Sequence, residues 1–191
     1  MKKSAIIIAI VAAFAGSAFA QTATVYKGSE PGKAGIAQTV DINATIVAID
    51  KATRDVTLRG PNGGEVVVTA GSAVQNFDMM KVGDLVHVKY IEALVLELKP
   101  SGGLAVTREE QKFAGGAMPG EQPAGVVGRR ITAVADVVNL DPATQTVTLK
   151  GPQRTIDVKV ADADQFKRIK MGDQVYATYT QALATVVEPG K

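Results

Sequence analysis

The feature that most constrains the fold of this chain is an internal duplication. Residues Val47–Pro61 match Val138–Pro152 at an offset of 91, and residues Phe77–Pro100 match Phe166–Pro189 at an offset of 89. The two-residue drift falls around residues 63–76, where a loop can absorb a change of length. The repeat period is too long for a solenoid, and two copies are too few. The duplication therefore predicts two tandem domains.

Each copy has the periodicity of short strands with one helix. Apolar and polar residues alternate from Val40 to Ile46, which is typical of a half-buried strand. The apolar phase slips at Val47, and at Val138 in the second copy, so we expect a β-bulge that bends this long strand. Further strands are expected at residues 56–58, 66–69, 84–90 and 93–99, with a short helix over residues 73–81. The predicted order is strand, strand, strand, helix, strand, strand.

Four short motifs recur in both copies. They are an Asp-x-Ala-Thr turn at Asp50, a Gly-Pro turn at Gly60, a Lys-x-Gly-Asp sequence at Lys81 and a Tyr-x-x-Ala-Leu sequence at Tyr90. Together with the order of elements, they resemble exported bacterial domain families of unknown function with OB-like small β-barrels. The resemblance implies a mainly β fold of two tandem OB-like five-stranded barrels, each with one short helix between strands 3 and 4. It also implies an envelope location, and it carries no site residues.

The repeats predict the domain organisation. We expect a signal peptide at residues 1–20, an N-terminal extension at 21–35, a first β-barrel repeat at 36–100, a Gly/Pro-containing connector at 101–125 and a second β-barrel repeat at 126–189. Such a connector lets the two domains move relative to one another, and the alternative is a connector packed along both barrels. Thr107 begins a capping-box pattern, which predicts a helical turn near residues 106–113.

The first twenty residues have the pattern of a secretory signal. Lys2 and Lys3 form the basic start, an uncharged and mostly apolar run follows, and Ala18-Phe19-Ala20 fits the small-x-small cleavage rule. We expect cleavage between Ala20 and Gln21, and hence a periplasmic or secreted protein. The alternative is a retained anchor, but the run is shorter than the about 20 apolar residues of a spanning helix.

Charge and composition disfavour several function classes. The chain has 21 basic and 19 acidic residues, and loss of Lys2 and Lys3 with the signal leaves 19 of each, a formal net charge of zero. A nucleic-acid-binding protein carries a basic surplus or stripe, so a nucleic-acid partner is disfavoured. The chain contains no cysteine, which excludes disulfides, thiolate nucleophiles and cysteine metal sites.

No residue pattern predicts a catalytic, cofactor-binding or metal-binding site. His87 is the only histidine and falls on the polar phase of its strand, without convergent partners. The acids Asp50 and Asp84 recur as Asp141 and Asp173, but each lies at a turn, where Asp is structurally favoured. The tyrosines Tyr90 and Tyr179 lie on the apolar phase and are expected to close the core, with an aromatic ligand platform as the alternative.

These observations predict an exported, non-enzymatic envelope protein with no cofactor. Its two similar barrels would act as binding or interaction modules, with an envelope protein or a glycan as the expected partner. One alternative is an oligosaccharide-binding or oligonucleotide-binding protein of the OB type. Another is a structural or assembly protein that pairs through exposed edge strands. The sequence predicts no oligomeric state.

Overall fold

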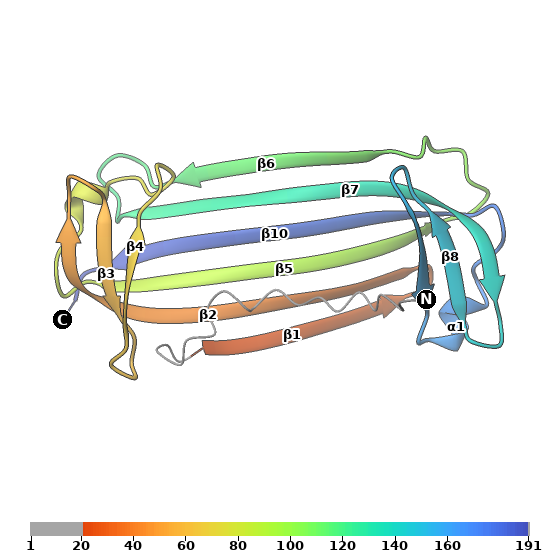
Figure 1. Cartoon of the computed structure of the whole chain (residues 1–191), viewed down its shortest axis with the longest axis horizontal. Helices are drawn as coiled ribbons and strands as arrows, with labels where there is room; N and C mark the ends of the chain where they lie inside the picture. Colours follow the sequence, from red (N-terminus) through yellow and green to blue (C-terminus); the bar gives the residue numbers. More distant parts are fainter. Residues whose placement is uncertain (1–20, 191) are drawn as a thin grey trace.

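A computed structural model describes residues 21–190 of the chain, and it confirms a mainly β fold (Figure 1). The first repeat and the extension before it contain β1 (Gln21–Glu30), β2 (Lys33–Asp50), β3 (Asp55–Arg59), β4 (Glu65–Thr69), the 3-10 helix η1 (Phe77–Met79) and β5 (Leu85–Lys99). The second repeat and the connector before it contain β6 (Arg108–Gly116), β7 (Ala124–Asp141), β8 (Thr146–Lys150), β9 (Thr155–Lys159), α1 (Ala163–Phe166) and β10 (Gln174–Glu188).

All the strands belong to one antiparallel sheet. Its order is β4-β3-β2-β5-β10-β7-β8-β9, while β1 also pairs with β2 and β6 with β7. The central strands β5 and β10 pair along their whole length, from Leu85 opposite Glu188 to Lys99 opposite Gln174. Residues that correspond in the two repeats therefore exchange places about an approximate twofold axis, which passes between Glu92 and its counterpart Gln181.

Two separate five-stranded barrels are not what the structure shows. The strands of both repeats are joined in one sheet that does not close on itself. The strands expected at residues 84–90 and 93–99 are a single strand, β5, because Tyr90, Glu92 and Leu94 continue the alternation without an intervening glycine or proline. A strand of this length extends beyond its own repeat and pairs with its counterpart.

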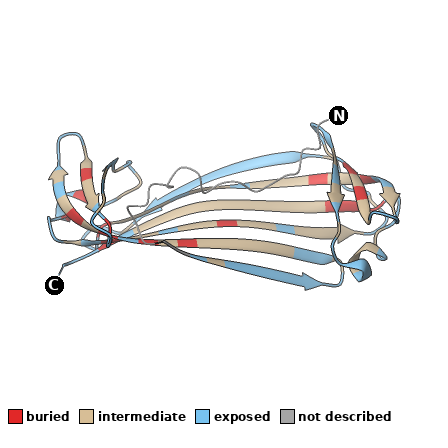
Figure 2. Ribbon diagram, turned by 60° about the horizontal axis from the view of Figure 1, so that its bottom comes forward, coloured by how far each residue is buried: buried red, intermediate tan, exposed pale blue. Residues whose placement is uncertain are grey.

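The hydrophobic core is divided between the two ends of the sheet, where the buried positions gather (Figure 2). At one end Ile46, Val56 and Phe77 of the first repeat pack with Val187 of the second. At the other end Val137 and Val147 of the second repeat pack with Leu96 and Leu98 of the first, which are among the partly buried side chains around that cluster. Each core thus needs side chains from both repeats.

The long strands β2 and β7 bend where the sequence predicts. The register of β2 against β3 shifts between Ile46 and Ala48, and that of β7 against β8 shifts between Val137 and Asn139. These positions bracket Val47 and Val138, so the predicted bulges are confirmed. An extra residue at a bulge strengthens the local twist, and here it carries the short hairpins β3–β4 and β8–β9 over one face of the sheet (Figure 1).

Two local predictions were wrong. The expected helical turn near residues 106–113 lies largely in strand β6, whose residues Arg108–Gly116 pair with β7. The helix expected over residues 73–81 is reduced to the three-residue η1. In both segments tertiary pairing and packing outweigh a weak local preference. The predicted extension (21–35) and connector (101–125) both contribute strands to the sheet.

Amide side chains at corresponding positions hold each repeat to the other. The Asn76 amide nitrogen donates to the carbonyl oxygens of Met118 (2.6 Å) and Glu121 (3.0 Å), in the turn between β6 and β7. Its counterpart Gln165 donates to the carbonyl of Glu30 (2.6 Å) and accepts from the backbone N–H of Gly32 (3.0 Å), in the β1–β2 turn. The two repeats are therefore interlocked.

Candidate functional site

The two faces of the sheet differ in character. We call the face covered at its ends by the β3–β4 and β8–β9 hairpins the inner face (Figures 1 and 2). Alternation along β5 places Val86, Val88, Tyr90 and Glu92 on the inner face, as the packing of Val86 and Val88 in the first core shows. We call the opposite face the outer face; alternation along β5 places His87 and Lys89 there.

An apolar cavity of about 340 Å³ lies at the end of the inner face beneath the β3–β4 hairpin. Its walls come from β2, β3, β4, β5, β7 and β10, together with the loop that follows β4. Ile42, Val88 and Leu183 are among the lining side chains, and Thr185 and Tyr90 supply polar atoms. This size and composition fall within the range of small-molecule sites in proteins.

The rim of the cavity depends on a close backbone approach at Gly125. The loop after β4 lies over the start of β7, where the Gln75 N–H donates to the Ala124 carbonyl at 3.0 Å. A Cβ atom at Gly125 would lie 2.7 Å from the carbonyl oxygen of Ala73, so only glycine leaves room for this crossing. The crossing places Ala70 and Val74 in the cavity wall.

A row of polar side chains crosses the middle of the inner face. Gln38, Glu92, Gln181, Arg129 and Lys112 stand opposite one another on β2, β5, β10, β7 and β6. Glu92 is only 5 % exposed, although it is acidic. We call these five residues the polar row.

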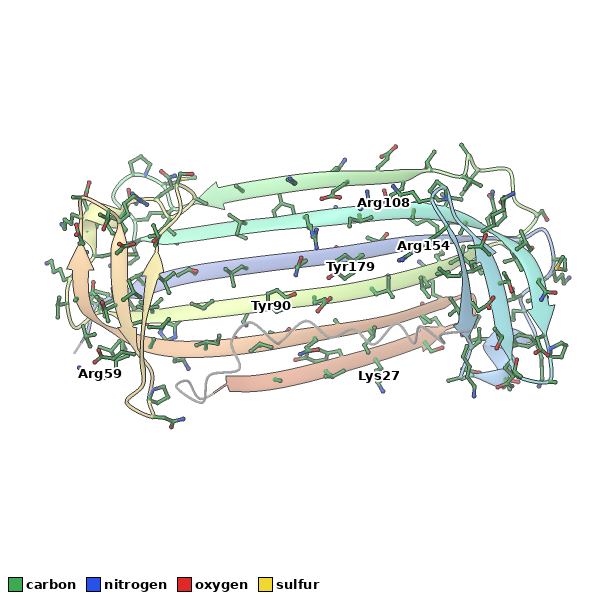
Figure 3. The ribbon with its side chains drawn as sticks, in the orientation of Figure 1. Lys27, Arg59, Tyr90, Arg108, Arg154 and Tyr179 are labelled. Carbon is green, nitrogen blue, oxygen red and sulfur yellow. The ribbon has the colours of Figure 1, made fainter. Side chains whose placement is uncertain are left out.

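Hydrogen bonds connect the polar row to the two tyrosines. The Tyr179 hydroxyl donates to one Glu92 carboxylate oxygen at 2.5 Å, and the Tyr90 hydroxyl lies 3.5 Å from the other. The Gln181 amide donates to the Tyr90 oxygen at 2.6 Å, while Arg129 Nε donates to the Gln181 carbonyl oxygen at 2.9 Å. Figure 3 shows Tyr90 and Tyr179 in the middle of the sheet, between its two folded ends.

The surroundings raise the pKa of both tyrosine hydroxyls, which are protonated at neutral pH. Burial raises the pKa of Tyr179 well above its usual value of 10, and the hydrogen bond to the Glu92 carboxylate and its charge raise it further. Burial also raises the pKa of Tyr90, although its hydrogen bond with Gln181 acts in the opposite direction. The tyrosines are therefore neutral donors for the Glu92 carboxylate.

His87, the single histidine, lies on the outer face away from the cavity. Its Nδ1 is 2.7 Å from Asn43 Oδ1, and its Nε2 is 3.6 Å from the Glu188 carboxylate. Its side chain is 44 % exposed. Neither partner belongs to the polar row, so the structure brings His87 into no contact with the cavity or with the tyrosines.

The recurring aspartates hold turns. Asp50 and Asp141 accept backbone N–H groups two residues ahead, from Ala52 at 2.8 Å and Ala143 at 3.0 Å. A hydrogen bond from the Thr144 hydroxyl is the main cause that lowers the pKa of Asp141. Asp50 and Asp141 are the last residues of the bent strands β2 and β7, apart from the polar row.

Asp84 and Asp173 hold the turns that precede β5 and β10. They accept backbone N–H groups three residues earlier, from Lys81 and Lys170, each at 2.9 Å. Asp173 also accepts the Ser101 N–H at 3.0 Å, which ties the end of β5 to the turn before β10. Neither acid faces the polar row.

Sequence reasoning missed Glu92, Gln181 and Arg129. A signal for the first two was present: each stands two residues after a recurring tyrosine, on the apolar phase of its strand, where a charge or amide needs partners. Arg129 gave no such signal, because it belongs to a basic doublet with Arg130.

The predicted cleavage junction lies between Ala20 and Gln21. Ala20 lies outside the described residues, and Gln21 is the first residue of β1.

Within residues 21–190, no three acidic or histidine side chains gather to hold a metal ion, and no helix has the length and apolarity needed to cross a bilayer. No protein-family model, curated protein or solved structure matches the chain.

Proposed function

We propose that this chain is an exported, non-enzymatic binding module that takes a small apolar ligand into the cavity beneath the β3–β4 hairpin. The cavity itself is the observation that carries the proposal. Its walls are almost wholly aliphatic, and Tyr90 and Thr185 are among the few polar side chains that would orient a ligand. A ligand that covers these side chains would gain roughly 25 cal/mol for each Å² of apolar surface removed from water.

The polar row supports binding rather than catalysis. Glu92 is a buried acid on the inner face, and its two carboxylate oxygens already face the tyrosine hydroxyls. A general base needs an oxygen that can reach a substrate proton, and a nucleophile needs an adjacent base. We therefore propose a structural and orienting role for these residues.

The fluorescent probe 1-N-phenylnaphthylamine tests the proposal with the purified mature protein. We expect saturable binding of one probe per chain, and an affinity at least tenfold weaker in Thr185→Leu. Leucine is the residue at the corresponding position of the other repeat, Leu96, so the fold should accept it. The matched control is Thr180→Leu on the same strand, where the alternation places the side chain on the outer face. Absence of saturable binding would overturn the proposal, as would equal affinities in Thr185→Leu and the unmodified protein.

The location is part of the same proposal. The basic start, apolar run and Ala-x-Ala motif support cleavage after Ala20 and release into the periplasm or medium. Mass spectrometry of the protein recovered from the periplasm should give a chain that begins at Gln21. A chain that keeps Met1 and sediments with membranes would contradict this part.

Kinship with OB-like domains also remains a proposal. Within each repeat, a long bent strand, a short hairpin, a helical turn and a further strand follow in the order that the resemblance implies. An opened unit of this kind, joined to its copy through β5 and β10, accounts for both the repeat and the single sheet. An experimental structure in which the repeats form separate closed barrels would favour the simple tandem arrangement.

Assembly through edge strands is the second candidate function. Among the described residues, β1 and β6 each pair along one side only, with β2 and β7. Val25 and Tyr26 on β1 are 53 % and 61 % exposed. Unpaired strand edges can add a strand from a partner. Sedimentation of the mature protein over a wide concentration range should reveal self-association, and a strict monomer would count against self-assembly.

A further inference from the structure

The inner end of the cavity adjoins the polar row. Leu183 and Val127 stand opposite each other on β10 and β7, and both line the cavity. Gln181 and Arg129 are the next residues on the same face of these strands. Two residues along a strand correspond to about 6.6 Å, which is within the length of an arginine side chain. An apolar molecule in the cavity would therefore end beside Arg129.

Arg129 is the member of the polar row best suited to receive an anion. A guanidinium has five N–H donors, and within residues 21–190 the structure shows one hydrogen bond of this group, from Nε to Gln181. Lys112 stands directly opposite Arg129 on β6 and adds a second positive charge. Arg129 is half-buried, so an ion pair formed there would be less screened than one at the surface.

The nearby carboxylates do not cancel this positive charge. Glu92 already accepts a hydrogen bond from the Tyr179 hydroxyl at 2.5 Å, and the Tyr90 hydroxyl lies 3.5 Å from its other carboxylate oxygen. Glu110, on β6, is paired with Arg108 at 2.9 Å. A hydrogen bond from Arg108 lowers the pKa of Glu110, and the charges of Arg129 and Lys112 lower it further. The three basic side chains Arg108, Lys112 and Arg129 therefore face two carboxylates, Glu92 and Glu110, and one positive charge is left in excess.

We propose that the ligand is a single-chain amphiphile with a carboxylate head: its alkyl chain fills the cavity, and its carboxylate pairs with Arg129. The inference rests on the proposed function, because it assumes that the cavity is occupied. A planar guanidinium binds a carboxylate through two parallel hydrogen bonds, which gives the head a defined orientation.

Comparison of the two repeats supports a site at one end only. The counterpart of Arg129 is Gln38, which has no charge, and the counterpart of Thr185 is the bulkier apolar Leu96. Leu96 packs against the core of its own end of the sheet. The positions that would hold the head and the chain of the ligand have thus diverged together, while the turns and core positions around them recur.

Displacement of 1-N-phenylnaphthylamine by twelve-carbon amphiphiles, below the concentration at which each forms micelles, tests the inference. We expect dodecanoate to compete at least tenfold better than dodecanol or dodecyltrimethylammonium, with an advantage that declines as salt is added. In Arg129→Gln, which installs the residue of the other repeat, the affinity for dodecanoate should fall about tenfold while that for dodecanol stays unchanged. Arg129→Lys should keep part of the preference. The matched control is Arg130→Gln, because Arg130 is the exposed neighbour on the opposite face.

The outcomes separate this inference from the proposed function. If neither the probe nor any amphiphile binds, the cavity proposal fails. If dodecanol competes as well as dodecanoate and Arg129→Gln has no effect, the assignment of the head is overturned while the cavity stands. If dodecyl phosphate or dodecyltrimethylammonium binds more tightly than dodecanoate, the assignment of a carboxylate head is likewise overturned. If circular dichroism shows that Arg129→Gln is unfolded, Lys112→Gln is a second variant. We expect its affinity for dodecanoate to fall a few fold.

Discussion

Glu92 and Gln181 occupy the same position in the two repeats and face each other across β5 and β10, at the approximate twofold axis of the sheet. One is an acid and the other an amide, so the axis joins a carboxylate to a neutral donor instead of to a second carboxylate. This difference allows the two halves to pair where identical halves would bring two charges together.

Replacement of Gln181 by glutamate tests that relationship. In Gln181→Glu two carboxylates would face each other on the inner face, and we expect a loss of about 2 kcal/mol or more in the free energy of unfolding at pH 7. The loss should shrink towards pH 5, because repulsion raises the pKa of the pair and one carboxylate takes up a proton. Urea unfolding at the two pH values measures the effect. Glu92→Gln is the matched control, with an expected cost of about 1 kcal/mol; equal costs for the two variants would contradict the prediction.

Alkaline destabilisation should depend on Tyr179. Its raised pKa means that the folded state holds the phenolic proton more tightly than the unfolded state does. This contribution is present in full below the unfolded pKa of 10 and is lost as the pH rises through the folded value. We expect the free energy of unfolding to fall above pH 10, and to fall less steeply in Tyr179→Phe. Tyr26→Phe, at an exposed edge, should keep the steep decline; a decline unaffected by Tyr179→Phe would refute the assignment.

Val187 should be important for the stability of the opposite repeat. It is fully buried in the core formed mainly by the first repeat, whereas the adjacent Val186 is 40 % exposed. Val187→Ala leaves a cavity in that core, and we expect a loss of about 2 kcal/mol in the free energy of unfolding. Val186→Ala should cost less than about 0.5 kcal/mol. Thermal or urea unfolding of both variants measures the difference, which should be absent if the cores were independent.

The isolated repeats should not fold as monomers. A fragment of residues 21–101 keeps Ile46 and Val56 but lacks Val187, so its core is incomplete. Each fragment can complete a sheet only by pairing its long strand with that of a second copy. Two Glu92 carboxylates would then meet at the axis in the first fragment, and two Gln181 amides in the fragment 102–191. We expect the second fragment to dimerise more tightly, and Glu92→Gln to strengthen the dimer of the first. Sedimentation equilibrium with circular dichroism would show this; a folded monomer of either fragment would disprove it.

The sequence was most informative where one residue type has one structural use. The slips of apolar phase at Val47 and Val138 predicted the two bulges, since a side-chain period of two leaves no other way to keep an apolar face inward. The aspartates at the turns accept the backbone N–H groups that such residues favour. These features depend on neighbours a few residues away.

The helical predictions were less reliable, because a local preference for helix competes with pairing to strands that are distant in the sequence. The segment around Thr107 has a capping pattern worth about 1 kcal/mol, whereas a strand that pairs with β7 gains a full ladder of hydrogen bonds and cross-strand contacts. The candidate site was not predictable from spacing. Arg129, Glu92 and Tyr179 lie far apart in the chain and meet only because β5, β10 and β7 are neighbours in the sheet.

By itself, the sequence determined the duplication, the strand-rich character of each copy, the bends in its longest strands and the turns that join them, because periodicity and turn chemistry act locally. The tertiary structure alone decided that β5 and β10 pair along their whole length. That pairing merged two expected barrels into one open sheet, shared the cores between the repeats and brought Glu92 opposite Gln181. Strand partners are chosen by long-range contacts, so the cavity and the polar row emerge only from the folded chain.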